Sequence, residues 1–155
     1  MGKLVTEAQS KGIVMEKCKV VLVAHDDIKY VWDEVAPLMD VALKHSEGEL
    51  LTEDLVEHLD SDDLRLWVAM KNDRVIAAMI TEIITYPRKK ILRVITLAGK
   101  DMDLWYDFLP SVEGYALSQQ CSALEAWTRK GMTRKLKDWT HSYDIITTDL
   151  KPRMQ

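Results

Sequence analysis

The fold of this chain is decided at residues 97–105, which read LAGKDMDLW. The segment before Gly99 has the pattern of a β-strand, and the segment from Met102 onward carries an apolar stripe with helical spacing. A strand that ends at a glycine and leads directly into a helix presents unpaired backbone N–H groups, which suit a phosphate. The turn therefore predicts a cofactor-using enzyme if it is occupied and a scaffold if it is empty.

Three segments before this turn have the two-residue period of β-strands. They are Leu64–Met70, Val75–Tyr86 and Ile91–Ala98, and they are separated by Asn72-Asp73 and by the turn Pro87–Lys90. Connections this short join antiparallel neighbours. We therefore expect three consecutive antiparallel strands.

A strand and two helices are expected ahead of these strands. Cys18–Ala24 is short, β-branched and apolar, as in a buried strand. An apolar stripe over Ile28–Leu43 predicts a helix that is capped by one residue of the pair Asp26-Asp27 and kinked or split at Pro37. A second helix is expected to begin with Thr52 as its N-cap.

Four more elements are expected after the turn. They are a helix over Met102–Gln120, a strand over Ala123–Trp127, a short basic helix over Thr133–Trp139 and a final strand over Tyr143–Leu150. The full order is then β-α-α-β-β-β-α-β-α-β. This order predicts an α+β (mixed α/β) fold with a mixed, mostly antiparallel sheet and helices on both faces.

Length and composition favour one soluble domain. The 155 residues are 47% hydrophobic and 30% charged, and we expect an N-terminal arm or short first element at 1–17 before a single domain at 18–155. No apolar run approaches the roughly 20 residues of a membrane span, and the first residues lack the pattern of a secretory signal. Cys18 and Cys121 are expected to be reduced thiols in a cytosol-like compartment.

The net charge of −4 does not suggest a nucleic-acid partner, but the charge is unevenly distributed. Residues 1–85 hold 9 Lys/Arg and 17 Asp/Glu, whereas residues 86–155 hold 12 and 8. An acidic patch over Glu47–Asp63 would attract a cationic amine or a basic protein, or it is simply a solvated helix face. A basic patch would likewise meet a CoA phosphate, nucleic acid or an acidic partner, or it is simply a solvated face: Arg129, Lys130, Arg134, Lys135 and Lys137.

Several motifs accompany this order of elements. Residues 86–90 read YPRKK, residues 121–126 read CSALEA and residues 129–132 read RKGM. Together with LAGKDMDLW, and with the order of elements from about Lys19 to Leu150, they resemble the GNAT family of N-acetyltransferases. The motifs are most similar to those of small GNAT-like proteins from tailed bacteriophages.

The resemblance implies acetyl-CoA as cofactor, with its pyrophosphate held by a loop of the pattern Arg/Gln-x-x-Gly-x-Gly/Ala. Aligned on Gly99, this chain has Thr96 in the first position and Asp101 in the last, so the motif is incomplete. The Asp101 carboxylate would repel a pyrophosphate, which Lys100 would partly offset, or it would instead cap the helix. The residues that the resemblance assigns to cofactor binding are Ile95, Leu97, Ala98, Gly99, Lys100, Asp101 and Met102.

The resemblance also implies a base for the acceptor amine and often a tyrosine acid on the fourth helix. Glu82 is the one carboxylate in Val75–Tyr86 and is the candidate base, unless it is paired with Arg93 on the next strand. The expected fourth helix contains no tyrosine, and Tyr143 is the nearest candidate acid, or else a packing residue. The four histidines lack the spacing of metal ligands, so no metal is expected.

Two functions are compatible with these features. The first is an acetyl-CoA-dependent N-acetyltransferase of phage type that acts on an amine-bearing substrate or a basic protein in the host cytoplasm. The alternative is a catalytically silent phage protein, packaged in the virion, that uses the scaffold to bind other phage proteins or itself. Membrane and nucleic-acid partners are not expected.

Overall fold

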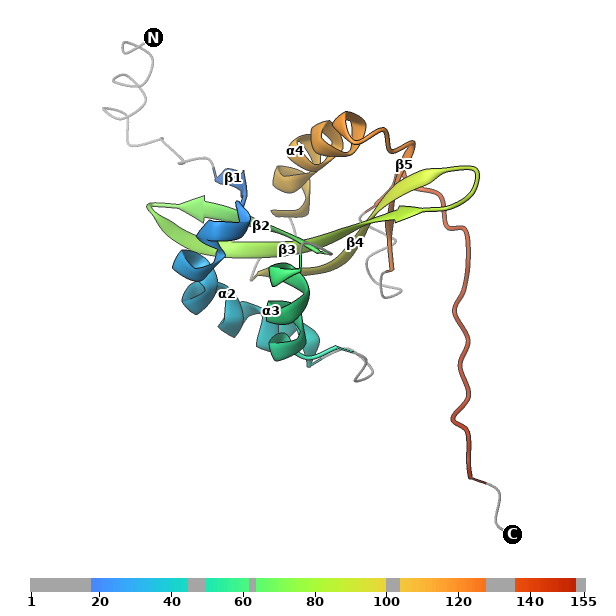
Figure 1. Ribbon diagram of the computed structural model, residues 1–155. Helices are drawn as coiled ribbons and strands as arrows, with labels where there is room; N and C mark the ends of the chain where they lie inside the picture. The colour runs from blue at the N-terminus through green and yellow to red at the C-terminus, as the bar shows by residue number, and fades with distance from the viewer. Residues whose placement is uncertain (1–17, 45–49, 62–63, 100–103, 128–135, 153–155) are drawn as a thin grey trace.

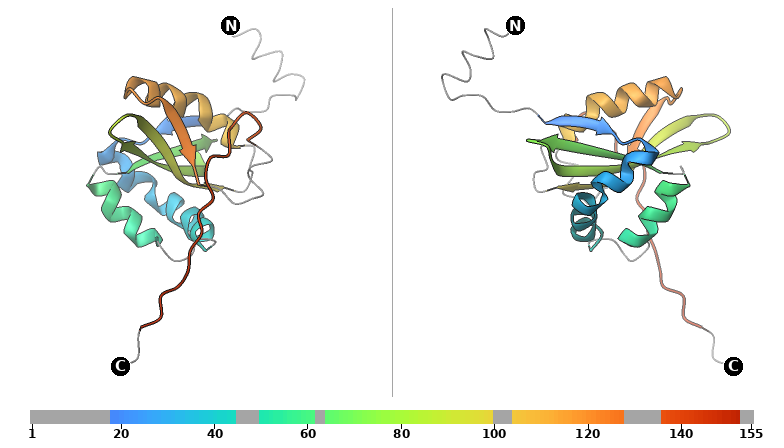
Figure 2. Two further views of the ribbon diagram at one scale, coloured as in Figure 1. Left: turned by 90° about the vertical axis from the view of Figure 1, so that its right-hand side faces the viewer. Right: turned by 60° about the vertical axis from the view of Figure 1, so that its left-hand side comes forward.

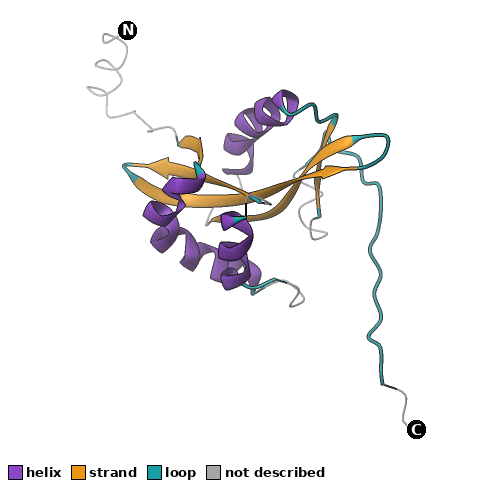
Figure 3. Cartoon of the chain, viewed as in Figure 1, coloured by secondary structure: helices purple, strands orange, loops and turns teal. Residues whose placement is uncertain are grey.

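The computed structural model describes residues 18–44, 50–61, 64–99, 104–127 and 136–152 (Figure 1). Helices lie on both faces of a sheet that crosses the middle of the molecule (Figures 1 and 3). The elements in chain order are β1 (Lys19–Leu22), the 3-10 turn η1 (His25–Asp27), α2 (Ile28–Leu43), α3 (Thr52–Asp60), β2 (Arg65–Lys71), β3 (Arg74–Thr85), β4 (Lys90–Gly99), α4 (Leu104–Ser118) and β5 (Ala123–Ala126).

The sheet has the strand order β1-β2-β3-β4-β5. The first four strands are antiparallel to their neighbours, and β5 pairs with β4 in parallel. A parallel neighbour requires a crossover, which α4 provides between β4 and β5. The predicted fold class, a mixed and mostly antiparallel sheet with helices on both faces, is therefore confirmed.

Two cores lie against the two faces of the sheet. On one face α4 packs Phe108 and Val112 onto Trp67 and Leu92. On the other face α2 and α3 bury Val35, Met39, Leu55 and Leu59 against β2 and β3. Figure 2 shows α4 on the opposite side of the sheet from α2 and α3. The central strands β2 and β3 contribute buried side chains to both cores, which explains their nearly continuous apolar sequence.

The turn between β2 and β3 has the geometry that its sequence predicts. Asn72 and Asp73 have φ angles of 53° and 60°, and they form a two-residue loop between paired Lys71 and Arg74. Two positive φ angles define the type I′ hairpin turn, which Asn and Asp tolerate better than most residues. This predicted turn is confirmed.

The helix starts differ from the prediction. Asp27 precedes α2, but its side chain makes no capping hydrogen bond. Thr52 is the first residue of α3 rather than its cap, and its hydroxyl donates to the Asp40 carboxylate at 2.6 Å. The cap position belongs to Leu51, whose N–H donates to the Asp54 carboxylate at 2.9 Å. The Asp54 carboxylate in the first turn therefore accepts the N–H of the cap residue, whereas the predicted threonine cap would have accepted an N–H of the first turn.

The two prolines inside helices do not divide them. Pro37 lies within one continuous α2, so the predicted split is wrong, and Pro110 lies within α4. Each proline is exposed, and so are the residues one turn earlier, Asp33 and Tyr106. Each proline ring therefore lies on the solvent side of its helix, where it displaces no core side chain.

The C-terminal segment departs most from the prediction. Residues 140–152 contain no helix or strand, so the predicted last strand over Tyr143–Leu150 is wrong for this chain on its own. Most of the predicted basic helix lies outside the described residues, and its end, from Leu136 to Trp139, is a turn. Trp139 still contacts the α4 side of the core: its ring packs edge-on against the ring of Trp105, and the two ring centres are 5.6 Å apart.

Candidate active site

The second half of β4 has an open edge. β5 pairs with β4 only from Ile91 to Val94, and within the described chain residues 96–99 pair with β3 alone. The pairing of β4 with β3 also shifts here, because Thr81 lies opposite Val94 while Ile80 lies opposite Thr96. Ile95 is therefore the extra residue of a β-bulge.

A bulge bends its strand and increases the local twist. This bulge falls immediately after the last residue that pairs with β5, so β4 bends where the two parallel strands part. Alternate N–H and C=O groups on the outer side of residues 95–99 are left without a strand partner among the described residues. Such an edge can accept an extended ligand that carries amide groups.

The predicted cofactor residues on β4 present their backbone rather than their side chains. Ile95 packs against the α2–α3 core, and Leu97 packs against the α4 core. Ala98 is buried, with 2% of its surface exposed. Because these side chains are committed to the two cores, the groups left for a ligand at these positions are N–H and C=O.

Close packing between β3 and β4 explains why residue 99 is a glycine, which the sequence alone did not reveal. A Cβ atom at this position would lie 2.9 Å from the Cβ of Ala77, its partner on β3. The glycine is therefore required by the sheet itself, and its presence alone does not indicate a phosphate site. The rest of the predicted turn, Lys100, Asp101 and Met102, lies outside the described residues, and α4 begins at Leu104.

Glu82 lies next to the point where β4 and β5 part. It is half-buried on β3 directly opposite Arg93, one residue beyond the Thr81–Val94 pair. The extra residue of the bulge belongs to β4, so Glu82 keeps the same face of β3 as Ile80, which contacts the α2–α3 core. Arg93 forms its ion pair with Glu125 and not with Glu82. The role of Glu82 as a base stays a prediction.

Arg93 is the centre of a polar cluster that the sequence analysis missed. Its Nε donates to the Glu125 carboxylate at 2.7 Å, and its Nη2 donates to the Tyr86 hydroxyl at 3.2 Å. The guanidinium also lies 4.4 Å from the ring centre of Trp127, whose indole N–H donates to the same Glu125 oxygen at 2.9 Å.

This cluster fastens β5 to the first half of β4. Arg93 and Glu125 are register partners across the parallel pair, and their side chains are 18% and 32% exposed. A charge-assisted hydrogen bond and a stacked guanidinium at partly buried positions stabilise the pairing. The strand register, which brings residues 93 and 125 together, could not be read from the sequence.

Tyr143 lies at the other end of β4 from the open edge. Its side chain is 87% exposed in the segment after residue 139. It lines a surface hollow of about 610 Å³ together with Glu125 and residues 86–89 of the turn before β4. The hollow adjoins the start of β4 rather than residues 95–99, and the proposed role of Tyr143 as an acid stays a prediction.

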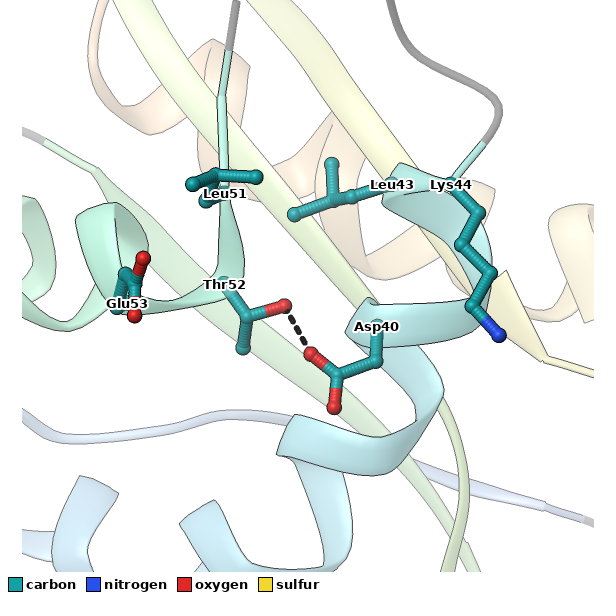
Figure 4. Close-up of a pocket in the computed structure, with 6 residues that line it drawn as sticks. All are labelled: Asp40, Leu43, Lys44, Leu51, Thr52 and Glu53. Carbon is teal, nitrogen blue, oxygen red and sulfur yellow. Dashed lines mark hydrogen bonds between the residues drawn. The ribbon is translucent and has the colours of Figure 1, made fainter. Parts of the chain in front are cut away.

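The acidic patch is partly structural. The Asp54 carboxylate of the patch accepts the Leu51 N–H, and Thr52 donates to Asp40 of α2, which lies outside the patch. Asp40 and Thr52 line a hollow between the end of α2 and the start of α3 (Figure 4). At about 220 Å³ this hollow is smaller than the roughly 300–1,000 Å³ of typical small-molecule sites. Glu53 is exposed at its rim, and Glu47 lies outside the described residues. Of the basic patch, the structure describes only Lys137, which is exposed.

The described residues contain no candidate metal site and no candidate membrane span. They bring no three His, Cys, Asp or Glu side chains together in a way that could hold a metal ion. Among the same residues, no helix is both long and apolar enough to cross a membrane.

Solved structures match this chain over most of its length, whereas no protein-family model and no curated protein sequence matches it. One is an aminoglycoside acetyltransferase from an uncultured soil metagenomic sample, in complex with sisomicin, which is 12% identical to this chain with a TM-score of 0.63. The match covers 86% of this chain and 97% of the acetyltransferase chain. A ribosomal-protein-alanine N-acetyltransferase from Brucella melitensis biovar Abortus 2308 is 14% identical with a TM-score of 0.62. This match covers 86% of the present chain and 98% of the Brucella chain.

A GNAT family acetyltransferase from Staphylococcus aureus is 12% identical with a TM-score of 0.60, covering 87% of this chain and 100% of its own. At these identities the likeness establishes the fold, and the protein has the fold of the GNAT acetyltransferases. The sequence resemblance to that family is thus confirmed for the fold. Its narrower part, the likeness to phage proteins, stays a prediction.

Proposed function

We propose that this protein is an acetyl-CoA-dependent N-acetyltransferase. The observation that carries the proposal is the open edge of β4, residues 95–99, which begins at a bulge where β5 departs. The acyl-pantetheine arm of acetyl-CoA is extended and contains two amide groups, so it fits a strand edge whose N–H and C=O groups are unpaired. The GNAT fold of the chain supports this assignment.

The chain itself would do three things at this edge. The backbone of residues 95–99 would hold and orient the arm, and the start of α4 would offer N–H groups to a phosphate. When bound, acetyl-CoA supplies an acetyl group that is activated as a thioester. Glu82 would accept the proton that the attacking amine loses as its nitrogen bonds to the acetyl carbon, while the C–S bond of the thioester would break and coenzyme A would leave as the thiolate.

The acceptor in this proposal is a cationic amine. Exposed carboxylates of α3, including Glu53 and Glu57, would attract it, because they lie on the same side of the sheet as Glu82. Two structural neighbours are named for amine-bearing acceptors, an aminoglycoside and a ribosomal-protein alanine. Basic proteins and small polyamines are accordingly the acceptors to test first.

Thermal unfolding in the presence and absence of acetyl-CoA tests the proposal. Ligand at about 100 times its dissociation constant should stabilise the fold by roughly 2.7 kcal/mol, which for a chain of this size raises Tm by about 5–10 °C. Adenosine 3′,5′-bisphosphate is the control, because it lacks the pantetheine arm and should give a smaller shift. No shift with acetyl-CoA, at concentrations up to several millimolar, would refute the proposal.

The alternative function is a phage scaffold that has lost the cofactor. It is favoured by the incomplete loop motif, in which Thr96 stands in the first position, and by the packing requirement that explains Gly99 without a ligand. This alternative predicts no response to acetyl-CoA and copies of the chain inside purified phage particles. Mass spectrometry of such particles distinguishes it from an enzyme confined to the infected cell.

A further inference from the structure

Trp105, the second residue of α4, carries a buried hydrogen-bond donor without a partner. Its side chain is 2% exposed, and its indole N–H has no acceptor among the described residues. Two other indole N–H groups are paired: that of Trp67 donates to the Thr81 hydroxyl at 3.0 Å, and that of Trp127 donates to Glu125 at 2.9 Å. An indole N–H usually has a partner when it is buried, because an unpaired buried donor costs stability. A phenylalanine at this position would avoid that cost, so the indole needs an explanation.

The path of α4 places Trp105 over the open half of β4. The N–H of Ser122, four residues after α4, donates to the Lys90 carbonyl at 2.8 Å, so the end of the helix meets the start of the strand. The helix therefore runs antiparallel to β4, and its first turn lies toward the end of the strand (Figure 1). Trp105 lies 13 residues before the last residue of α4, which is about 20 Å along a helix and equals about six residues of a strand. Counted from Ile91, that distance reaches Leu97, whose side chain packs against the core that contains Trp105.

Trp139 packs against the ring that carries the unpaired donor. It follows β5 in the chain, and its ring lies edge-on to that of Trp105. Trp105 is thus flanked by the open half of β4 and by the chain that follows β5. An acyl-pantetheine arm on residues 95–99 would run between these two parts. Trp139 is only half-buried and belongs to a turn, so it is the neighbour of Trp105 that can yield to a ligand.

We propose that the indole N–H of Trp105 donates a hydrogen bond to an amide carbonyl of the acyl-pantetheine arm of acetyl-CoA. This inference rests on the proposed function, because it requires acetyl-CoA at the open edge of β4. In the complex the donor gains the acceptor that the described chain does not provide. Trp105 is then a cofactor-binding residue that fixes how far the arm reaches along the strand, and thereby holds the thioester in place.

The first test uses the full chain without any substitution, labelled with ¹⁵N at its tryptophans. Each of the five tryptophans gives one indole N–H signal in an NMR spectrum, assigned through bonds from the backbone. Saturating acetyl-CoA should move the Trp105 signal downfield, as a new hydrogen bond does. The signals of Trp67 and Trp127 should move less, since their N–H groups are already paired. Adenosine 3′,5′-bisphosphate lacks the arm and should leave the Trp105 signal in place.

The second test measures dissociation constants by calorimetry for Trp105→Phe, which keeps an aromatic ring and removes the donor. Acetyl-CoA should bind about five- to tenfold more weakly, as expected for the loss of one hydrogen bond. The affinity for adenosine 3′,5′-bisphosphate should be unchanged. Trp67→Phe is the matched control, because it also removes a buried indole N–H, but one that is paired with Thr81. This control should bind acetyl-CoA within twofold of the unaltered chain.

The outcomes separate this inference from the proposed function. If acetyl-CoA raises Tm but leaves the Trp105 signal in place, or binds Trp105→Phe as tightly as the unaltered chain, the role of Trp105 is refuted and the proposed function stands. If acetyl-CoA does not raise Tm, both are refuted. Should Trp105→Phe fail to fold, the spectra of the unaltered chain decide.

Discussion

The two halves of β4 differ although they form one strand. Residues 91–94 are hydrogen-bonded to both β3 and β5, and Arg93 fastens this half to Glu125. Residues 96–99 are hydrogen-bonded to β3 alone within the described chain, and Ile95, Thr96 and Leu97 are only half-buried. The difference shows how a single bulge can divide a strand into a structural half and a half that is open to a ligand.

The largest expected effect concerns the residue beside the boundary between these halves. Glu82→Gln should lower kcat/KM for acetyl transfer by about 10²–10⁴-fold, because general bases contribute effects of this size. The acetyl-CoA-induced rise in Tm should stay unchanged, since Glu82 is not expected to bind the cofactor. Glu113→Gln, exposed on α4, is the control and should leave the rate within twofold. An unchanged rate for Glu82→Gln would exclude Glu82 as the base.

The next largest effect is expected on stability, from the apolar side chains that each half of β4 packs into the core. Leu92→Ala removes a fully buried side chain and should lower the free energy of unfolding by about 2–5 kcal/mol in urea titrations. Leu97→Ala removes a half-buried side chain from the open half. It should therefore lower the free energy of unfolding by about half as much as Leu92→Ala. Equal costs for the two variants would mean that the open half is as well packed as the paired half.

Gly99 tests whether the open half is constrained by packing or by a ligand. Gly99→Ala places a Cβ atom against Ala77 and should cost about 1–3 kcal/mol of stability. Adding Ala77→Gly removes the clash, so the double variant should be more stable than Gly99→Ala alone in a double-mutant cycle. If the two substitutions have purely additive costs, the proposed clash is not the reason for the glycine.

The smallest effect on stability is expected from the polar cluster around Arg93, which links residues 91–94 of β4 to β5. Arg93→Met should lower the free energy of unfolding by about 1–2 kcal/mol, because it removes the partly buried hydrogen bond to Glu125 and the contact with Trp127. Arg74→Met is the matched control, since the Arg74–Glu34 pair has a similar distance but an arginine that is 77% exposed. Exposed pairs of this kind contribute about 0–1 kcal/mol. A larger loss for Arg74→Met than for Arg93→Met would contradict this account of the cluster.

Most of the sheet could be predicted from the sequence, because its signals are local. The two-residue period located β2, β3 and β4 to within one residue at each end, and the pair Asn72-Asp73 identified the tight turn between β2 and β3. The apolar stripes located α2 and α4, and of the kink or split that Pro37 suggested, the split is absent. In these segments local preference and tertiary packing agree.

The candidate site was less predictable, because it depends on register and on packing between strands. The parallel register that sets Arg93 beside Glu125 and the bulge at Ile95 are properties of paired strands rather than of one segment. The close approach of Gly99 to Ala77 likewise joins positions far apart in sequence. Residues 143–150 were predicted as a strand from their composition, but strand formation also requires pairing, and these residues pair with no strand of the described chain.

Hydrogen–deuterium exchange along β4, followed residue by residue by NMR with and without acetyl-CoA, tests the division of this strand most directly. The account predicts that outward-facing amides among residues 95–99 become at least tenfold slower to exchange when acetyl-CoA binds, while those of residues 91–94 are nearly unchanged. Equal slowing in both halves, or binding of acetyl-CoA without protection of residues 95–99, would contradict it.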